Sequence, residues 1–309
     1  MEHTLSACPA EQAGHVDTCT EEADMLKSII LPMTPGSPDN SSIAAAADLA
    51  KVFQACVTGL FVRSDPRSAV PFMGEGLTAD MIQQLCDTAE RQGLAQAEEG
   101  HDRFTCIMAE KTIPVIDEGG GDDARAHWSV MVGAITDHVG RRARVADLAV
   151  CQQPGDDDGD ARDILHELLF RSGRALLMVP KGMTGAIGRR VMIAWNGRAE
   201  GARAIANAMP FLKRADSVHL VQIGDIDAER PCLEDLAAYL AEHGVTGRID
   251  RRPDDPRDVG SALLAVAGEI DADLMVIGAY SHARWREMVL GGVTRSIVAD
   301  AGIPVFMSH

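Results

Sequence analysis

The sequence alternates short, continuously apolar segments with segments of helical periodicity, and it does so twice along the chain. Nine segments have the length and apolar content of strands: residues 29–33, 57–62, 128–132, 147–151, 175–179, 190–195, 218–223, 273–277 and 304–307. A tenth, more polar segment, residues 246–250, is expected to be a short strand. Because such alternation requires crossover connections, it predicts a mostly parallel sheet with helices on both faces. Strands that are apolar throughout fit burial on both of their faces.

Two matching fragments indicate that the alternation is an internal repeat. Residues 146–150 read Ala-Asp-Leu-Ala-Val, and residues 272–276 read Ala-Asp-Leu-Met-Val. We therefore expect an α/β fold of two tandem doubly wound units, the first over 25–182 with a less regular insertion at 64–125, the second over 188–309. The acidic segment 1–24 has no apolar cluster and is expected to be a disordered tail.

The last strand of each predicted unit has no partner within its own unit on one side. Both 175–179 and 304–307 are apolar, and an unpaired apolar edge strand promotes aggregation. We expect the two strands to pair with each other, which makes the chain a pseudo-dimer. Within the insertion we expect a helix that begins at Thr78 and continues through Leu94.

Charge and cysteine content exclude several classes of protein. The chain has 29 Lys and Arg against 46 Asp and Glu, a net charge of −17, which disfavours binding to nucleic acid or to anionic membranes. No apolar run reaches the length of a membrane span, and the acidic N-terminal segment is not a secretory signal. The seven cysteines form no CxxC pair, which disfavours a disulfide framework or a zinc site. We expect a soluble cytoplasmic protein.

The segment 278–294 contains the densest set of groups suited to ligand binding. It follows an apolar strand and precedes a helix, which is where open α/β sheets bind ligands. Glycines allow close approach of the backbone, and the free N–H groups at a helix start favour a phosphate. A surface loop whose glycines serve only tight turns remains an alternative. The candidate residues are Gly278, Ser281, His282, Arg284, Gly291, Gly292, Val293 and Thr294.

This segment resembles the signature of the universal stress protein family: glycine, two residues, glycine, nine residues, glycine, then serine or threonine. Gly278 and Gly291 match the first and third glycines. Ser281 stands at the second glycine and Gly292 at the hydroxyl residue. The resemblance covers 25–309 as two copies, and it is specific in the second copy and weak in the first.

The resemblance implies a five-stranded parallel sheet in each unit and a role in stress response or adaptation. Some family members bind ATP, with the signature loop on the phosphates and an aspartate after the first strand near the adenine. Asn196 holds that position in the second unit and Thr34 in the first. If the chain binds a nucleotide, we therefore expect it in the second unit only, with its adenine near Ala194, Trp195 and Asn196. The first unit resembles a degenerate structural copy.

We interpret the chain as a non-catalytic sensor or binding module, with ATP as the nucleotide that the resemblance offers. The sequence contains no paired nucleophile and base and no cluster of metal ligands. Two alternatives remain open: an ATP-binding regulator with slow hydrolysis, and a structural protein that docks a partner protein without a ligand. The resemblance also leaves open whether the pseudo-dimer forms a homodimer.

Overall fold

The computed structural model describes residues 26–35, 39–69, 78–117, 120–155, 158–253, 258–279 and 292–309. The predicted tail, residues 1–24, lies outside this part of the chain, and so do residues 280–291 of the signature segment.

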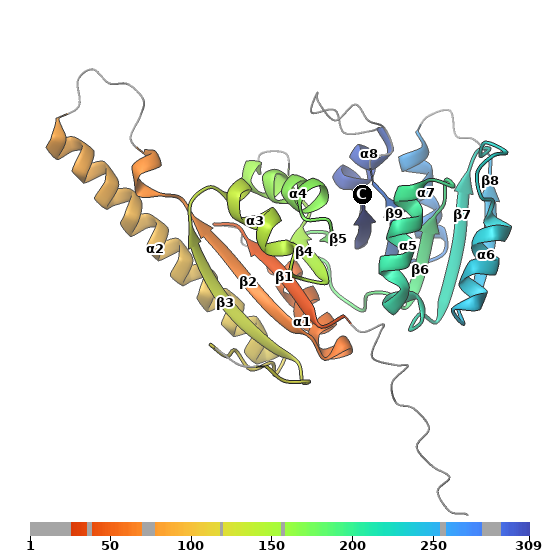
Figure 1. The fold of residues 1–309 in the computed structure, drawn as a ribbon, viewed down its shortest axis with the longest axis horizontal. Coiled ribbons are helices and arrows are strands. Elements are labelled where there is room, and N and C mark those ends of the chain that lie inside the picture. Colours follow the sequence, from red (N-terminus) through yellow and green to blue (C-terminus); the bar gives the residue numbers. More distant parts are fainter. Residues whose placement is uncertain are drawn as a thin grey trace, which may run out of the picture.

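The described residues form two series of strands and helices (Figure 1). The first half comprises β1 (Ser28–Met33), α1 (Ser41–Phe53), β2 (Cys56–Arg63), a short 3-10 helix η3 (Pro66–Ala69), α2 (Ala79–Glu110), β3 (Arg125–Val132), α3 (Ile135–Ala143), β4 (Leu148–Gln152), α4 (Gly159–Arg171) and β5 (Ala175–Val179). The second half comprises β6 (Arg190–Ala194), α5 (Ala199–Leu212), β7 (Ser217–Ile223), α6 (Leu233–Glu242), β8 (Gly247–Arg252), α7 (Val259–Glu269), β9 (Leu274–Gly278), α8 (Gly292–Asp300) and β10 (Val305–Ser308).

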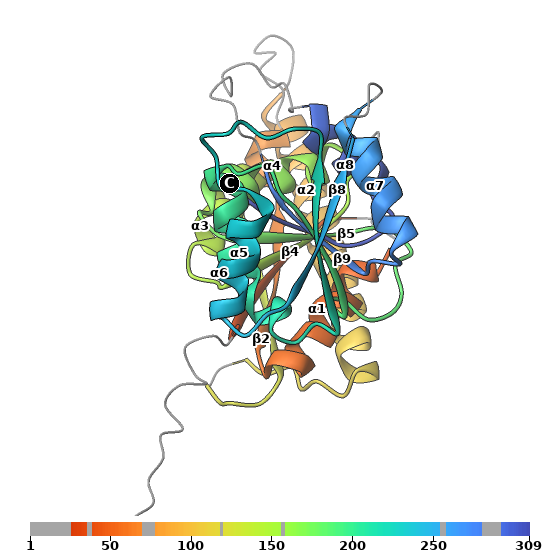
Figure 2. The same ribbon diagram turned by 90° about the vertical axis from the view of Figure 1, so that its right-hand side faces the viewer.

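All ten strands lie in one sheet, in the order β3-β2-β1-β4-β5-β10-β9-β6-β7-β8. Within each half the strands are parallel, and both halves have the same internal order, which confirms the predicted α/β repeat. Figure 2 shows the successive strands rotated about a common centre, the usual twist of an open sheet.

The sheet separates two apolar cores that each extend through both halves. One core packs under α1, α2, α5 and α6, and the other packs under α3, α4, α7 and α8. The strands contribute side chains to both cores, since β5 and most of β4 and β9 are buried along their length. This burial on both faces explains why the strands are apolar without alternation.

The two halves join through β5 and β10, as the sequence predicts. These strands pair antiparallel, with Phe306 opposite Leu177 at the centre of the register. On one face of this junction, the ring of Phe211 lies 5.6 Å from that of Phe306 and 5.1 Å from that of Phe53. Phe53 belongs to the first half, so a chain of three aromatic rings crosses the junction.

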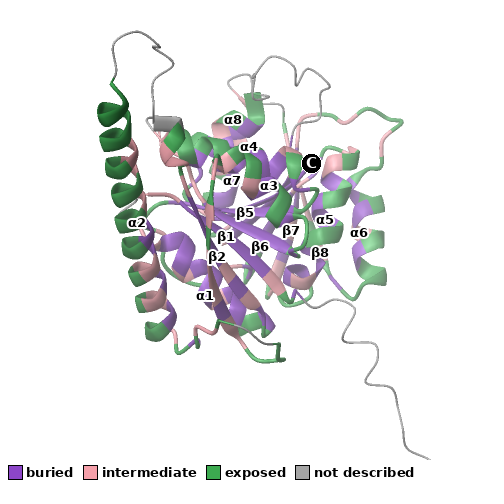
Figure 3. Ribbon diagram, turned by 60° about the vertical axis from the view of Figure 1, so that its left-hand side comes forward, coloured by how far each residue is buried: buried purple, intermediate pink, exposed green. Residues whose placement is uncertain are grey.

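Helix α2 is longer than the sequence analysis predicts, since it ends at Glu110 rather than near Leu94. Its side chains Phe104 and Met108 are buried against the sheet, whereas its N-terminal part projects beyond the sheet and is exposed (Figure 3). Met81, Leu85 and Leu94 are exposed apolar residues there. This exposed face favours the alternative in which the insertion docks a partner protein.

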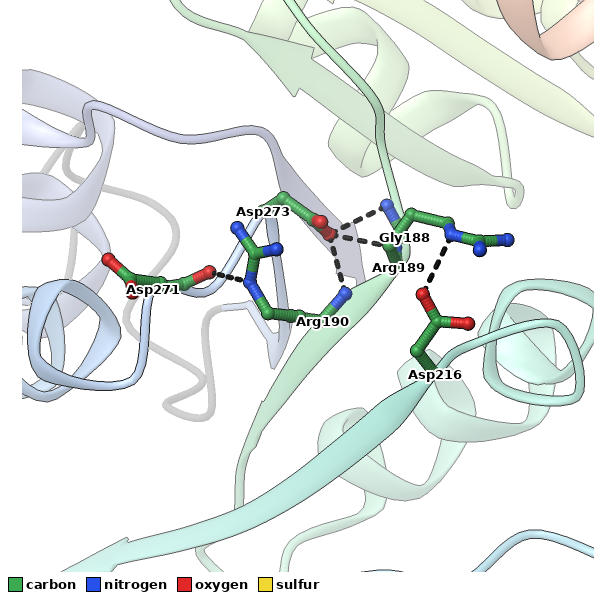
Figure 4. A network of polar contacts seen from close by, with 6 residues as sticks. All are labelled: Gly188, Arg189, Arg190, Asp216, Asp271 and Asp273. Carbon is green, nitrogen blue, oxygen red and sulfur yellow. Dashed lines mark hydrogen bonds and ion pairs between the residues drawn. The ribbon is translucent and has the colours of Figure 1, made fainter.

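The repeated aspartate holds the start of the first strand of each half. One carboxylate oxygen of Asp273 accepts hydrogen bonds from the backbone N–H groups of Gly188, Arg189 and Arg190, at 3.0, 2.8 and 2.9 Å (Figure 4). Asp147 accepts from Lys27 and Ser28, both at 2.9 Å. The fragment that revealed the repeat therefore has the same structural role in both halves.

An Asp273→Ala variant is expected to have a free energy of unfolding about 3 kcal/mol lower than that of the wild type, because three N–H groups lose a charged acceptor. Asp147→Ala removes only two hydrogen bonds, both exposed, and should lower the free energy of unfolding by about 1 kcal/mol. Asp216→Ala is the control in the same network: it breaks only the exposed pair with Arg189, and should change stability by less than about 0.5 kcal/mol. Urea unfolding measures all three, and equal losses would contradict this role of Asp273.

Candidate functional site

In the second half, the strand order reverses between β6 and β9, which are parallel neighbours. Open α/β sheets bind ligands at such a point, outside the carboxyl ends of the strands. Ala194 ends β6 and Gly278 ends β9, so the structure brings these two predicted site residues to one edge of the sheet. Helices α5 and α8 also begin at this edge, so the N-terminus of each helix lies beside the ends of the two strands.

Gly278 packs directly against the first turn of α5. A Cβ atom at this position would lie 2.3 Å from the backbone nitrogen of Gly201 and 2.6 Å from the carbonyl carbon of Glu200. Any side chain would force β9 and α5 apart, since real Cβ atoms do not approach the backbone so closely. The first glycine of the signature is thus required by the packing of the strand on the helix.

Trp195 follows β6 and is buried, with 7% of its surface exposed. Its indole N–H donates to the carbonyl of Pro231 at 2.9 Å, and its ring packs over Gly201. The indole is therefore part of the core beside the site, and it does not present an open face on which a base could stack.

Asn196 closes the turn that leads into α5. Its side-chain oxygen accepts from the backbone N–H of Arg198 at 3.1 Å, an arrangement common in Asx turns. Gly197 adopts a φ of 67°, where a Cβ atom would collide with Arg230 and approach the carbonyl of Pro231. The side-chain oxygen of Asn196, which stands where the family has an aspartate, is therefore already used in this turn.

The first turn of α8 combines an open position with a buried one. Among the described residues, nothing beyond its own helical turn lies within 4 Å of a Cβ placed on Gly292, and Val293 is exposed, whereas Thr294 is buried. The predicted residues Ser281, His282, Arg284 and Gly291 lie outside the described residues.

Two carboxylates lie near this edge and are already engaged. Glu200 pairs with Arg203 at 3.5 Å. Asp258 caps α7 by accepting from the N–H of Ser261, and its pKa is lowered by hydrogen bonds, first of all from the Ser296 side chain of α8. Arg203 offsets the charge of Glu200, whereas the lowered pKa keeps Asp258 ionised near the start of α8.

The equivalent position in the first half contains a crevice that the sequence analysis does not predict. Between the ends of β1 and β4 lies a crevice with a cavity volume of about 20 Å³, which opens to solvent. Six of the lining residues carry its chemistry: Thr34, Asp39, Ser42, Arg103, Cys151 and Gln152. The strand registers of the two halves place Gln152 at the position equivalent to Gly278. The internal repeat could therefore have identified Gln152 as a candidate site residue of the first half. Arg103 comes from α2, and no spacing in the sequence connects it to the strands.

Within the described part of the chain, no three His, Cys, Asp or Glu side chains gather closely enough to hold a metal ion. The same residues include no helix with both the length and the apolar content needed to cross a membrane.

Comparison with known proteins supports the resemblance stated above. Residues 225–309 match the model of the Universal stress protein family. The chain is similar in structure to a universal stress protein from Archaeoglobus fulgidus DSM 4304, at 15% identity and a TM-score of 0.67, over 92% of this chain and 97% of that one. It is also similar to a functionally unknown protein from Pseudomonas aeruginosa PAO1, at 13% identity and a TM-score of 0.52, over 92% and 93% of the two chains. No curated protein matches the sequence.

Residues 225–309 therefore match the universal stress protein family in sequence, and the chain as a whole shares the fold of the solved universal stress protein from Archaeoglobus fulgidus.

Proposed function

We propose that this protein is a non-catalytic binding module of the stress response whose second half holds an adenine nucleotide. The observation that carries the proposal is the edge formed by β6, β9 and the start of α8. Gly278 lets β9 lie flush on α5, and no neighbour in the described part of the chain lies within 4 Å of a Cβ on Gly292, in the first turn of α8. Free N–H groups at a helix start, together with the helix dipole, favour the phosphates of such a ligand. The family match over 225–309 includes β9 and the start of α8, whereas β6 precedes it.

In this proposal the phosphates lie near the signature residues Gly278, Ser281, His282, Gly291, Gly292 and Thr294, and Arg284 adds a charge-assisted contact. The adenine lies beside the backbone of Ala194 to Asn196 rather than on the indole ring, because Trp195 is buried. Binding without catalysis is the function we propose, since the described residues of the edge offer backbone N–H groups and no paired nucleophile and base.

A Gly292→Asp variant is expected to weaken ATP binding at least tenfold in isothermal titration calorimetry. The new carboxylate repels the phosphates. Its Cβ meets no described neighbour within 4 Å and its charge stabilises a helix N-terminus, so the fold should be retained. Gly302→Asp is the matched control, because it adds the same charge at another position with no neighbour within 4 Å. It should bind ATP as the wild type does.

Equal ATP affinities in the two variants would place the site elsewhere. If the wild type binds no ATP, partner docking becomes the better interpretation, with the exposed residues Met81, Leu85 and Leu94 of α2 as the surface to test. Release of phosphate from bound ATP, abolished by Gly292→Asp, would instead support the regulator with slow hydrolysis.

A further inference from the structure

The crevice of the first half differs from the edge of the second half in what fills it. In the second half a glycine brings strand and helix together, whereas in the first half Gln152 stands at that position and α2 contributes Arg103. Both polar side chains line the same crevice, together with Asp39 and Ser42.

Arg103 presents one edge of its guanidinium group without a strong partner. Its Nε atom is buried and has no hydrogen-bond partner among the described residues. Its Nη2 atom lies 3.5 Å from the carbonyl of Thr34, at the limit of a hydrogen bond. The Nε and Nη2 N–H groups form the fork that binds both oxygens of a carboxylate.

Gln152 presents an acceptor in the same crevice. Its Nε2 donates to the carbonyl of Val179 at 3.0 Å. This bond fixes the orientation of the amide, because a flipped amide would set two oxygens against each other. The Oε1 atom is therefore an acceptor, and it is buried without a partner in the part of the chain that the structure describes.

The charge of Arg103 is also uncompensated within the crevice. No carboxylate among the described residues lies within 4.0 Å of its guanidinium. Asp39 lines the crevice, but its two oxygens accept from the N–H groups of Ser41 and Gly182, at 2.8 and 2.7 Å. Burial raises the pKa of the Cys151 thiol to about 12, so this group adds no negative charge.

We propose that this crevice binds a small monocarboxylate that carries a hydrogen-bond donor, such as a hydroxyl group, next to the carboxyl group. The carboxylate engages the Nε and Nη2 edge of Arg103, and the donor satisfies Oε1 of Gln152. Asp158 and Asp160 at the start of α4, beside the lining residue Ala161, disfavour a doubly charged phosphate.

This site concerns the first half, so it does not depend on the nucleotide site proposed for the second. Ligand-observed NMR on the full-length protein, with Kd from titration, should rank glycolate above acetate at least threefold. Methoxyacetate should bind no better than acetate, because its ether oxygen cannot donate to Gln152. Inorganic phosphate should bind more weakly than glycolate.

An Arg103→Gln variant should weaken glycolate binding at least tenfold. Arg91→Gln is the matched control, because Arg91 lies on the exposed part of the same helix and contacts only its own turn. Gln152→Met, which keeps the length of the side chain and removes the acceptor, should abolish the preference of glycolate over acetate. Circular dichroism and the melting temperature verify that each variant is folded.

The proposal is overturned if the wild type binds no carboxylate at millimolar ligand in about 50-fold excess over the protein. It is also overturned if Arg103→Gln and Arg91→Gln bind glycolate equally. Tighter binding of phosphate than of glycolate would also overturn it, since a site for a phosphoryl group would then be the better assignment. ATP binding that survives Arg103→Gln leaves the second-half proposal standing, so the two proposals fail separately.

Discussion

A Gly278→Ala variant is expected to lose about 3 kcal/mol of unfolding free energy, or to fail to fold, although it adds only one methyl group. The reason is the position of the new Cβ atom, 2.3 Å from the backbone nitrogen of Gly201. Neither β9 nor the first turn of α5 can relieve that overlap by rotating a side chain. Urea unfolding followed by circular dichroism measures the loss.

Gly292→Ala provides the matched control within the same signature. A Cβ atom there meets nothing within 4 Å, so this variant should retain its stability to within about 1 kcal/mol. A similar loss in both variants would mean that the signature glycines act through backbone conformation alone. Little loss in either variant would show that Gly278 is not packed as described.

A Phe211→Ala variant is expected to be destabilised by about 4 kcal/mol, within the range observed for buried phenylalanine. Phe211 is buried, and its ring contacts both Phe53 of the first half and Phe306 of β10. The truncation opens a cavity at the junction of the halves. Calorimetry should still record one unfolding transition, because both cores continue across the junction.

Phe170→Ala is the control for this variant, since Phe170 is only partly buried and lies on the other side of the sheet, beside His166 and His309. It should cost about 1 kcal/mol. In a double-mutant cycle, Phe53→Ala and Phe211→Ala should couple by about 1 kcal/mol. Strictly additive effects of these two substitutions would argue that the rings do not join the halves.

The strands could be predicted from the sequence because burial on both faces leaves a plain signal. The apolar run at 175–179 coincides with β5, and the repeated aspartate marks the start of β4 and β9. The pairing of β5 with β10 also followed, because two apolar edges in one chain have each other as the simplest partner.

The full length of α2 was missed although the sequence contains its pattern. Its buried residues Ala97, Gly100, Phe104 and Met108 are spaced by three and four, as on one helix face, but charged residues between them obscure the stripe.

The chemistry of the candidate sites depends on contacts between distant segments. Spacing suggested that Gly278 approaches a ligand, whereas its nearest neighbour is the backbone of α5. Arg103 reaches its crevice from an inserted helix, and only the folded chain brings it to Gln152. The nucleotide site itself remains a prediction.

The antiparallel contact between β5 and β10 has a consequence for mass action. Because both strands belong to one chain and are joined through residues 180–189, their association is unimolecular, and dilution cannot separate the two units. Their pairing is therefore independent of how much protein a cell makes. A unit held in this way keeps its partner without competing for it, so Thr34 and Gln152 in the first half can differ from Asn196 and Gly278 in the second without loss of the pairing.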